Sequence, residues 1–523
     1  MKLAIDKKGN YQYAKVPGTS YREDGKVKKK GTIYLGRVID LENHVFYNKE
    51  RGVFTYDPDT GTFGEADASY QGLLKKDRRR REKLILDFGD TYFLDQLIRQ
   101  MHYDEVLEKL GYGNPDTLHS MVAYYVLSEQ SNMHAHTWYQ GNIASVLYPD
   151  ADLHSPRISD FLDFLGREDV RRKYFNAHIA WVKEQICEDP AIIVDSTGIP
   201  NDIRMELTQT NNHNGRIEHE MRMVTAVQRD SGCPLMFRAV AGNIVDVSTL
   251  PRTVAILSEY GIQTDFALLD AGYFSEKNAD SLCDAGIDFI TRLPARNKTL
   301  YRTVLDKGLD GLRKPENLVQ FQGRYVYIKQ VECTIGTKKQ KAYAYIGYDV
   351  DGSGDTNHKA ISSTQKKKKS TEEMHKIFAS SGIFVLLSTL PFRAEDVLEV
   401  YYIRQAVEQY FDLSKGASRL APLRVHNEQR VMGHLLLCQI AATINLTVQK
   451  KMEQCQENRE RLFLSLRNQK CEVFSDKVIT YEGQSGATKF YDAFHIKSPI
   501  GLVKRKQGWK PMETRSKSSN AAE

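Results

Sequence analysis

Hydrophobic and polar positions follow three different patterns along the chain. From residue 1 to about 65, short runs rich in Tyr, Val and Thr are separated by turns that contain Gly and Pro, which predicts a small β module. From about 84 to 186, apolar residues recur every three to four positions, which predicts amphipathic helices. From 191 onward, short β-branched runs alternate with amphipathic segments, and this order is typical of an α/β domain.

Within the α/β region, three strand-like runs come first, and a helix, a strand, a helix and a strand follow. The segments that show this order are AIIVDSTG, HEMRMVTAVQ, PLMFRAVA, VDVSTLPRTVAILSEYG and DFALLDAGYFSEKNADSLCDAGIDFITRL. Residues 299 to about 380 interrupt it with runs such as RYVYIKQVECTI, which alternate like antiparallel strands. GIFVLLST, from residue 382, restarts a buried strand. We therefore expect an α/β core that is interrupted by a β-rich insertion.

These patterns divide the chain into six predicted segments, and 523 residues are too many for one ordinary domain. They are a small β-rich module at 1–80, a helical region at 81–186, the first part of the α/β core at 187–298, the β-rich insertion at 299–380, the second part of the core at 381–452, and a C-terminal region at 453–523. The polar end of the chain, SKSSNAAE, predicts partial disorder there.

The net charge, the cysteines and the lack of long apolar runs exclude several classes of protein. The net charge of +6 is mildly basic for this length, so it permits a nucleic-acid partner without demanding one. The seven cysteines are scattered without CxxC spacing, which argues against a disulfide framework or a zinc site and for a reducing cytoplasm. With no run of 18 or more apolar residues and no secretory signal at the N-terminus, we expect a cytoplasmic protein without a membrane partner.

The stretch YYIRQAVEQYFDLSK, residues 401–415, predicts a helix with one polar side. Tyr401, Arg404, Glu408 and Lys415 are separated by three, four and seven residues, so they share a side of a helix that turns about 100° per residue. Such a stripe is often only a ladder of surface ion pairs. It could also present one carboxylate between two cations to a ligand.

Two further acids favour the second interpretation. Asp195 ends the apolar run AIIV, and Asp270 ends FALL. Acids at the ends of strands lie where the edge of a parallel sheet opens to ligands, although either one alone is more often a turn or helix cap. With Glu408 they form a set of three carboxylates, which suits Mg²⁺ or Mn²⁺. Two such ions about 4 Å apart can activate an attacking oxygen and stabilise a leaving one in phosphoryl transfer.

These motifs together resemble a known family. The spacing Tyr401-x₂-Arg404-x₃-Glu408-x₆-Lys415 resembles the YREK signature of the bacterial DDE insertion-sequence transposases. VDSTG resembles the first-Asp segment of that family, PLMFRAVAGNIVDVSTL the segment before its second Asp, LLDAGYFS its second-Asp segment, and LRVHNEQRVMGHLLLCQIAATI the helix after its Glu. The resemblance covers about 190–450 well and 1–186 only in layout.

The resemblance implies a ribonuclease-H-like catalytic core with two divalent metal ions. It implies that Asp195, Asp270 and Glu408 are the catalytic metal ligands, and that Tyr401, Arg404 and Lys415 contact the transposon end. The implied reaction is cleavage of DNA at the terminal inverted repeats of an insertion sequence, followed by strand transfer. The partners would be double-stranded transposon ends, bound by the helical region 81–186, target DNA, and at least one further copy of the chain.

Two other functions remain open. The same three acids would serve a two-metal DNA nuclease without strand transfer, and a DNA-binding protein derived from a transposase would need none of them. Two basic runs, at 75–83 and 366–369, are most simply solvated segments, and the first is also a candidate for binding phosphates. Asn243 and Asp246 are expected to cap the helix that starts at about 247.

Overall fold

The structure is a computed structural model that describes most of the chain. The described residues are 3–8, 11–23, 26–48, 50–67, 69–70, 84–186, 191–213, 216–244, 246–295, 297–351, 382–416, 420–421, 423, 425–481 and 485–512. The basic runs 75–83 and 366–369, and the tail 516–523 with its predicted disorder, lie outside them. The chain forms two compact units: Met1–Leu86 with Cys471–Thr480 and Ile500–Glu523, and Asp87–Lys470 with Tyr481–Pro499.

The first unit is built from antiparallel sheets, in keeping with the strand-rich pattern at the start of the sequence. A six-stranded sheet has the order β1-β2-β5-β6-β7-β8, β3 pairs with β4, and a five-stranded sheet has the order β23-β22-β21-β20-β9. One side of the six-stranded sheet carries the buried core residues Ala14, Val16, Leu35, Phe46, Phe54 and Tyr56. The strands are β1 (Ala4–Lys8), β2 (Tyr11–Val16), β3 (Thr19–Glu23), β4 (Lys26–Lys30), β5 (Ile33–Asp40), β6 (Val45–Asn48), β7 (Gly52–Asp57), β8 (Thr62–Glu65), β9 (Leu84–Asp87), β20 (Lys470–Val473), β21 (Lys477–Thr480), β22 (Gly501–Arg505) and β23 (Gly508–Pro511).

The second unit starts with helices where the sequence predicts them. They are α2 (Gly89–Gln100), α3 (Tyr103–Glu108), α4 (Pro115–Leu127), α5 (Ala135–Gln140), α6 (Ala144–Leu147), α7 (Ser155–Gly166) and α8 (Glu168–Trp181). The start of α4 shows why such a helix begins where it does. The side chain of Asn114 accepts a hydrogen bond from the backbone N–H of Thr117, and Pro115 fills the first helical position.

A ten-stranded mixed sheet forms the body of the second unit, which is a mixed α/β fold. Its path is β11-β12-β10-β14-β15-β19-β18-β17-β16, and β13 also pairs with β12. The strands β10, β14 and β15 are mutually parallel, whereas β12 is antiparallel to both β10 and β13. These central strands are β10 (Ile192–Pro200), β11 (Gln209–His213), β12 (Arg216–Gln228), β13 (Pro234–Ala241), β14 (Phe266–Leu269) and β15 (Asp288–Arg292). The helices α9 (Asp246–Glu259) and α10 (Glu276–Asp284) connect β13, β14 and β15.

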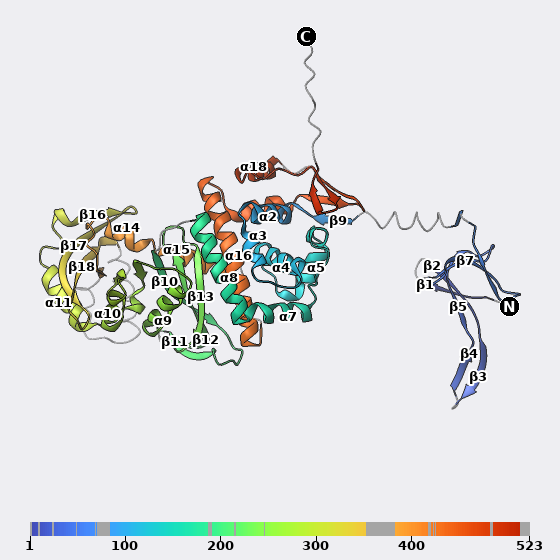
Figure 1. The fold of residues 1–523 in the computed structure, drawn as a ribbon, viewed down its shortest axis with the longest axis horizontal. Coiled ribbons are helices and arrows are strands. Elements are labelled where there is room, and N and C mark those ends of the chain that lie inside the picture. The colour runs from blue at the N-terminus through green and yellow to red at the C-terminus, as the bar shows by residue number, and fades with distance from the viewer. Residues whose placement is uncertain are drawn as a thin grey trace, which may run out of the picture. The chain divides into compact units, whose positions relative to one another are not determined.

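The β-rich insertion continues this sheet. The strands β16 (Leu318–Phe321), β17 (Arg324–Ile335) and β18 (Gln340–Asp349) follow the helix α11 (Lys298–Gly308). β18 pairs with β19 (Ile383–Ser388), and β19 pairs with β15 in the core. The insertion strands therefore extend the core sheet at one end of the unit (Figure 1).

The sequence predicts one helix over the YYIRQAVEQYFDLSK stretch, and this prediction is wrong in one respect. The structure has two helices, α14 (Val397–Tyr402) and α15 (Gln405–Lys415), with a break at Ile403 and Arg404. At the break, the backbone N–H of Arg404 bonds to the carbonyl of Tyr401 and that of Ala406 bonds to Ile403, a spacing of three residues. This tighter spacing is typical of 3₁₀ geometry and turns the chain locally.

The long helix α16 (Glu428–Gln454) lies in the second unit. In Figure 1 it runs beside the helices α3 and α8 from the start of that unit. It packs against α7 so closely that a Cβ on Gly433 would lie 2.0 Å from the carbonyl oxygen of Leu162. Among the described residues, α16 alone is long and apolar enough to cross a membrane, but 89% of its most apolar window is buried inside the protein. The helices α17 (Arg459–Arg467) and α18 (Ser485–Ala493) follow it in the chain.

Candidate active site

The parallel pairing of β10 and β14 places two acids side by side. Val194 on β10 pairs with Leu269, the last residue of β14. Asp195 follows Val194 within β10, and Asp270 follows the end of β14, so the two acids lie at the same level on strands about 4.8 Å apart. β10 is strongly apolar up to this point, because both sides of the strand are buried from Ile192 to Val194. The carboxylate of Asp195 is therefore held by a buried strand.

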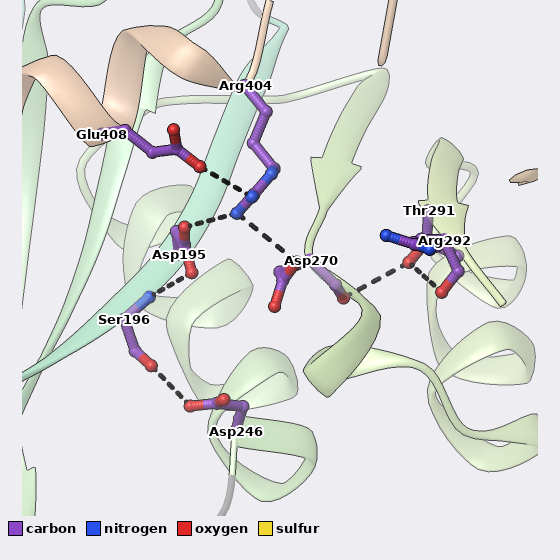
Figure 2. Close-up of polar contacts among 8 residues, drawn as sticks. All are labelled: Asp195, Ser196, Asp246, Asp270, Thr291, Arg292, Arg404 and Glu408. Carbon is purple, nitrogen blue, oxygen red and sulfur yellow. Dashed lines mark hydrogen bonds and ion pairs between the residues drawn. The ribbon is translucent and has the colours of Figure 1, made fainter. Parts of the chain in front are cut away.

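The helix α15 brings the third acid to the same place. It packs on β10, and Arg404 at its start reaches all three carboxylates. The guanidinium nitrogens of Arg404 lie 2.9 Å from Oδ2 of Asp195, 3.4 Å from Oδ1 of Asp270 and 2.8 Å from Oε1 of Glu408. Figure 2 shows the guanidinium in the middle of the three acids. One cation therefore joins carboxylates from two strands and a helix.

The three acids differ in burial. The side chain of Asp195 is only 12% exposed, compared with 38% for Asp270 and 53% for Glu408. Burial raises the pKa of Asp195 to about 7, Arg404 opposes this shift, and the nearby charge of Asp270 adds to it. Burial is therefore the main influence on this carboxyl group, and a further positive charge beside it would favour its charged form.

A fourth carboxylate lies behind Asp195. The backbone N–H of Ser196 donates to Oδ1 of Asp195 at 2.7 Å, and its hydroxyl donates to Oδ1 of Asp246 at 2.6 Å. Arg222 on β12 forms an ion pair with Asp246 at 3.1 Å. Asp246 is the first residue of α9, as the sequence predicts for a helix start, but its carboxylate is also tied to the strand that carries Asp195 (Figure 2).

Of the other residues expected at the site, Tyr401 is placed differently from the prediction. Its side chain is 6% exposed, and burial raises its pKa to about 12. A ring this buried is closed to stacking against a base, so the contact with DNA that the resemblance implies would come from its hydroxyl group. Lys415 is the last residue of α15, about two turns beyond Glu408. In the described part of the chain, neither residue takes part in the ion pairs around Arg404.

Sequence reasoning missed three residues of this site. The hydroxyl of Thr291, on β15, donates to the backbone carbonyl of Asp270 at 3.3 Å. Arg222 and Ser196 hold Asp246, as described above. For Ser196 a signal existed, since it follows Asp195 directly in the VDSTG segment. Arg222 and Thr291 reach the site through strand pairing, which no local pattern reveals.

The donor set suits a hard divalent cation, because carboxylate oxygens are the ligands that Mg²⁺ and Mn²⁺ prefer. In the residues that the structure describes, no three His, Cys, Asp or Glu side chains are gathered closely enough to hold one metal ion. Arg404 explains this spacing, since its guanidinium lies between the acids. The residues therefore fit a metal in type and charge, provided that Arg404 moves from its central position.

A comparison with protein families finds a match over the part of the chain that contains the three acids. Residues 187–444 match the family model described as the Transposase DDE domain. The matched range is just under half of the chain and includes Asp195, Asp270 and Glu408. This stretch is therefore similar in sequence to transposase DDE domains.

Among solved structures, the cryo-EM structure of the piggyBac transposase synaptic complex with hairpin DNA aligns with this chain. The alignment has a TM-score of 0.38 and 11% sequence identity, and it covers 68% of this chain and 70% of that chain. No curated protein matches the sequence.

Proposed function

Because residues 187–444 match a transposase DDE domain, we propose that the chain is a cut-and-paste DNA transposase of an insertion sequence. It would bind the terminal inverted repeats of the element, cut the DNA at those ends, and join the cut strand to target DNA. We further propose that it works in the bacterial cytoplasm, as at least a dimer on paired ends. The helical region 81–186 is the proposed reader of the terminal repeats.

We propose that the core is ribonuclease-H-like. The strand order β13-β12-β10-β14-β15, with three antiparallel strands followed by two parallel ones, supports this interpretation. In such an arrangement, Asp195 on β10 and Asp270 after the parallel strand β14 face the same edge of the sheet. The insertion lies between the second acid and the helix that carries the third.

Asp195, Asp270 and Glu408 are the proposed ligands of two divalent ions. When bound, such ions lower the barrier to phosphoryl transfer by activating the attacking oxygen and stabilising the leaving one. The chain itself positions the acids: β10 and β14 fix the two aspartates, and α15 delivers Glu408. The raised pKa of Asp195 fits this role, because a bound cation favours the charged carboxylate.

Arg404 is proposed to bind a DNA phosphate during the reaction, with Lys415 as a second phosphate contact and Tyr401 as a hydrogen-bond donor. A guanidinium can contact the acids in one state and a DNA phosphate in another, because it pairs with carboxylates and phosphates in the same forked geometry. Its present contact with the three acids would then be exchanged for contact with the DNA backbone.

The observation that carries the proposal is the convergence of Asp195, Asp270 and Glu408 on one guanidinium. The experiment compares the chain with its Asp270→Asn variant on a duplex that carries the element's own terminal repeat, with Mg²⁺. We expect end binding to persist and strand cleavage to be lost. Asp265→Asn, a change in the loop before β14, is the matched control and should cut normally.

A second assay separates the proposed function from its alternatives. With a pre-cut transposon end, joining to plasmid DNA supports a transposase, whereas cutting without joining indicates a nuclease. Binding without any metal-dependent cutting indicates a DNA-binding protein derived from a transposase. Cleavage by Asp270→Asn at the rate of the unchanged chain contradicts the assignment of the acids.

A further inference from the structure

Among the described residues of the first unit, the buried core of the six-stranded sheet lies on one side of the sheet. On β2, Ala14 and Val16 point into the buried cluster, so Tyr11, Tyr13 and Lys15 point to the other side, because successive side chains of a strand alternate. Tyr11 is 36% exposed and Tyr13 is 38% exposed. This second side of the sheet therefore presents aromatic rings to solvent.

The neighbouring strand β5 adds to the same side. Residues paired across an antiparallel sheet share a side, and Tyr13 pairs with Arg37 while Lys15 pairs with Tyr34. Tyr34, the second residue of β5, is 74% exposed. The guanidinium of Arg37 lies 4.0 Å from the ring centre of Tyr11. We call the set Tyr11, Tyr13, Lys15, Tyr34 and Arg37 the tyrosine face.

The charge around the tyrosine face favours an anionic partner. Residues 1–40 contain ten Lys and Arg against four Asp and Glu. One acid lies on the face itself, since Asp6 on β1 pairs with Lys15 at 2.5 Å. Exposed aromatic rings interleaved with cations, on adjacent strands of one sheet, combine stacking surfaces with phosphate-binding groups.

We propose that the tyrosine face binds single-stranded DNA. Single strands offer the flat faces of their bases to the rings of Tyr11, Tyr13 and Tyr34, while Lys15 and Arg37 meet the phosphates. A duplex keeps its bases stacked inside and offers only phosphates to such a surface, so it would use the cations alone. The proposal concerns the first unit and does not depend on the acids of the second unit.

The spacing of the rings fits an extended strand. Tyr11 and Tyr13 are two residues apart on one strand, which separates their positions by about 6.8 Å. Tyr34 is the partner of Lys15, so it lies further along the same direction on the next strand. The face therefore offers successive rings along a line, and sequence preference should be weak because every base has a flat face.

The test uses the full chain and a fluorescein-labelled oligo-dT of about 16 nucleotides, a length in the range that one such surface covers. Binding is followed by anisotropy, beside binding to a duplex of the same length. We expect Tyr13→Ala with Tyr34→Ala to weaken binding to the single strand about ten-fold per ring, with duplex binding unchanged. The paired Tyr13→Phe and Tyr34→Phe changes keep the rings and should keep the affinity.

Tyr481→Ala is the matched control, because Tyr481 is 42% exposed and lies outside the tyrosine face. Circular dichroism checks that each variant folds, and Tyr34→Ala alone serves if the double variant does not. Equal affinity of the alanine variants and the unchanged chain for oligo-dT would overturn the proposal. So would an equal loss of duplex binding, or a change in sedimentation that identifies the face as a contact between copies of the chain.

Discussion

The guanidinium of Arg404 lies 2.9 Å from the carboxylate of Asp195, although 209 residues separate the two in sequence. Arg404 stands at the break between α14 and α15, so a local turn of the chain aims it at the sheet. The contact ties the helix to the central strand of the core. It also means that the most buried acid of the site is held by a group that DNA phosphates would attract. The stability of the site and the metal binding proposed for it are therefore linked to one side chain.

The first prediction concerns the pH dependence of stability. The folded-state pKa of Asp195 is about 7 and its ordinary value is 3.8, so the folded chain keeps a proton that the unfolded chain loses between these values. This contribution to stability is fully present below pH 3.8 and is lost as the pH rises through 7. Asp195→Asn removes the titration. Its free energy of unfolding should exceed that of the unchanged chain by a margin that grows from pH 4 to 7 and is constant above, on the order of 4 kcal/mol, and its melting temperature should be higher accordingly.

That measurement should be made in EDTA and reported as a difference between the two chains. His178, which donates to the carbonyl of Pro234, has its pKa lowered to about 4 by burial. His178 therefore increases the free energy of unfolding as the pH rises from 4 to 6.5, whereas Asp195 decreases it over the same range. A constant difference between the two chains over the whole range would mean that Asp195 is charged in the folded protein at pH 5.

The second prediction concerns Arg404 and metal ions, and it rests on the proposed function. Without DNA, Arg404 competes with a divalent ion for the three acids. Arg404→Gln should therefore bind Mn²⁺ more tightly, with a rise in melting temperature on adding Mn²⁺ that exceeds the rise for the unchanged chain by about 2 °C or more.

Arg393→Gln is the control, since Arg393 is 76% exposed and pairs with Glu395 and Asp396. It should respond to Mn²⁺ as the unchanged chain does. If the Arg404→Gln protein gains no more than this control, the three acids are not metal ligands in the free protein.

The third prediction assigns a positioning role to Ser196 and Asp246. Ser196→Ala removes the hydrogen bond to Asp246 but keeps the backbone N–H that holds Asp195. Because groups that orient a ligand affect the reaction more than binding, the cleavage rate should fall about ten- to a hundred-fold with little change in affinity for the DNA end. Raising the Mg²⁺ concentration should restore part of the rate, which a merely structural defect would not allow.

Ser281→Ala is the matched control for this variant, because the exposed hydroxyl of Ser281 donates within its own helix α10, to the carbonyl of Lys277. A rate for Ser196→Ala that equals the rate for Ser281→Ala would remove Ser196 from the site.

The fourth prediction concerns the contact between α7 and α16. A methyl group on Gly433 would lie 2.0 Å from the carbonyl oxygen of Leu162, so Gly433→Ala forces the helices apart. We expect a loss of about 1–3 kcal/mol, seen as a lower melting temperature. Gly113→Ala is the control, because nothing lies within 4 Å of the added methyl. Equal melting temperatures for the two variants would show that the helices separate without cost.

Arg404 and the three acids around it show how much of the site the sequence predicts. The apolar runs predict that Asp195 and Asp270 each end a strand, and this is wrong for Asp195, which lies within β10. The two acids come together because Val194 on β10 pairs with Leu269, the last residue of β14. The helical period predicts that Arg404 and Glu408 share a side. Neither pattern predicts that Arg404 contacts all three acids, because that depends on how α15 packs against β10. Roles for these residues in catalysis remain predictions.

Tyr401 and Arg222 show what local patterns leave out. Periodicity places Tyr401 on the same side as Arg404, but it does not tell which neighbour covers the ring, and the break after α14 buries it. Arg222 comes from a strand-like run with no feature that singles it out. It reaches Asp246 only through the pairing of β12 with β10 and β13, which joins residues far apart in the chain. Contacts of this kind are decided by tertiary packing.

The pairing of β19 with β15 has a consequence for how the protein is made. During synthesis, β15 is complete at Arg292, but its partner begins at Ile383, 91 residues later. Until then β15 is an open edge that other strands could pair with, and closing the sheet requires a contact between distant segments, which slows folding. The nascent chain is therefore most exposed to aggregation while the insertion is being synthesised. Substitutions between Arg292 and Ile383 should change the need for chaperones more than substitutions of the three acids.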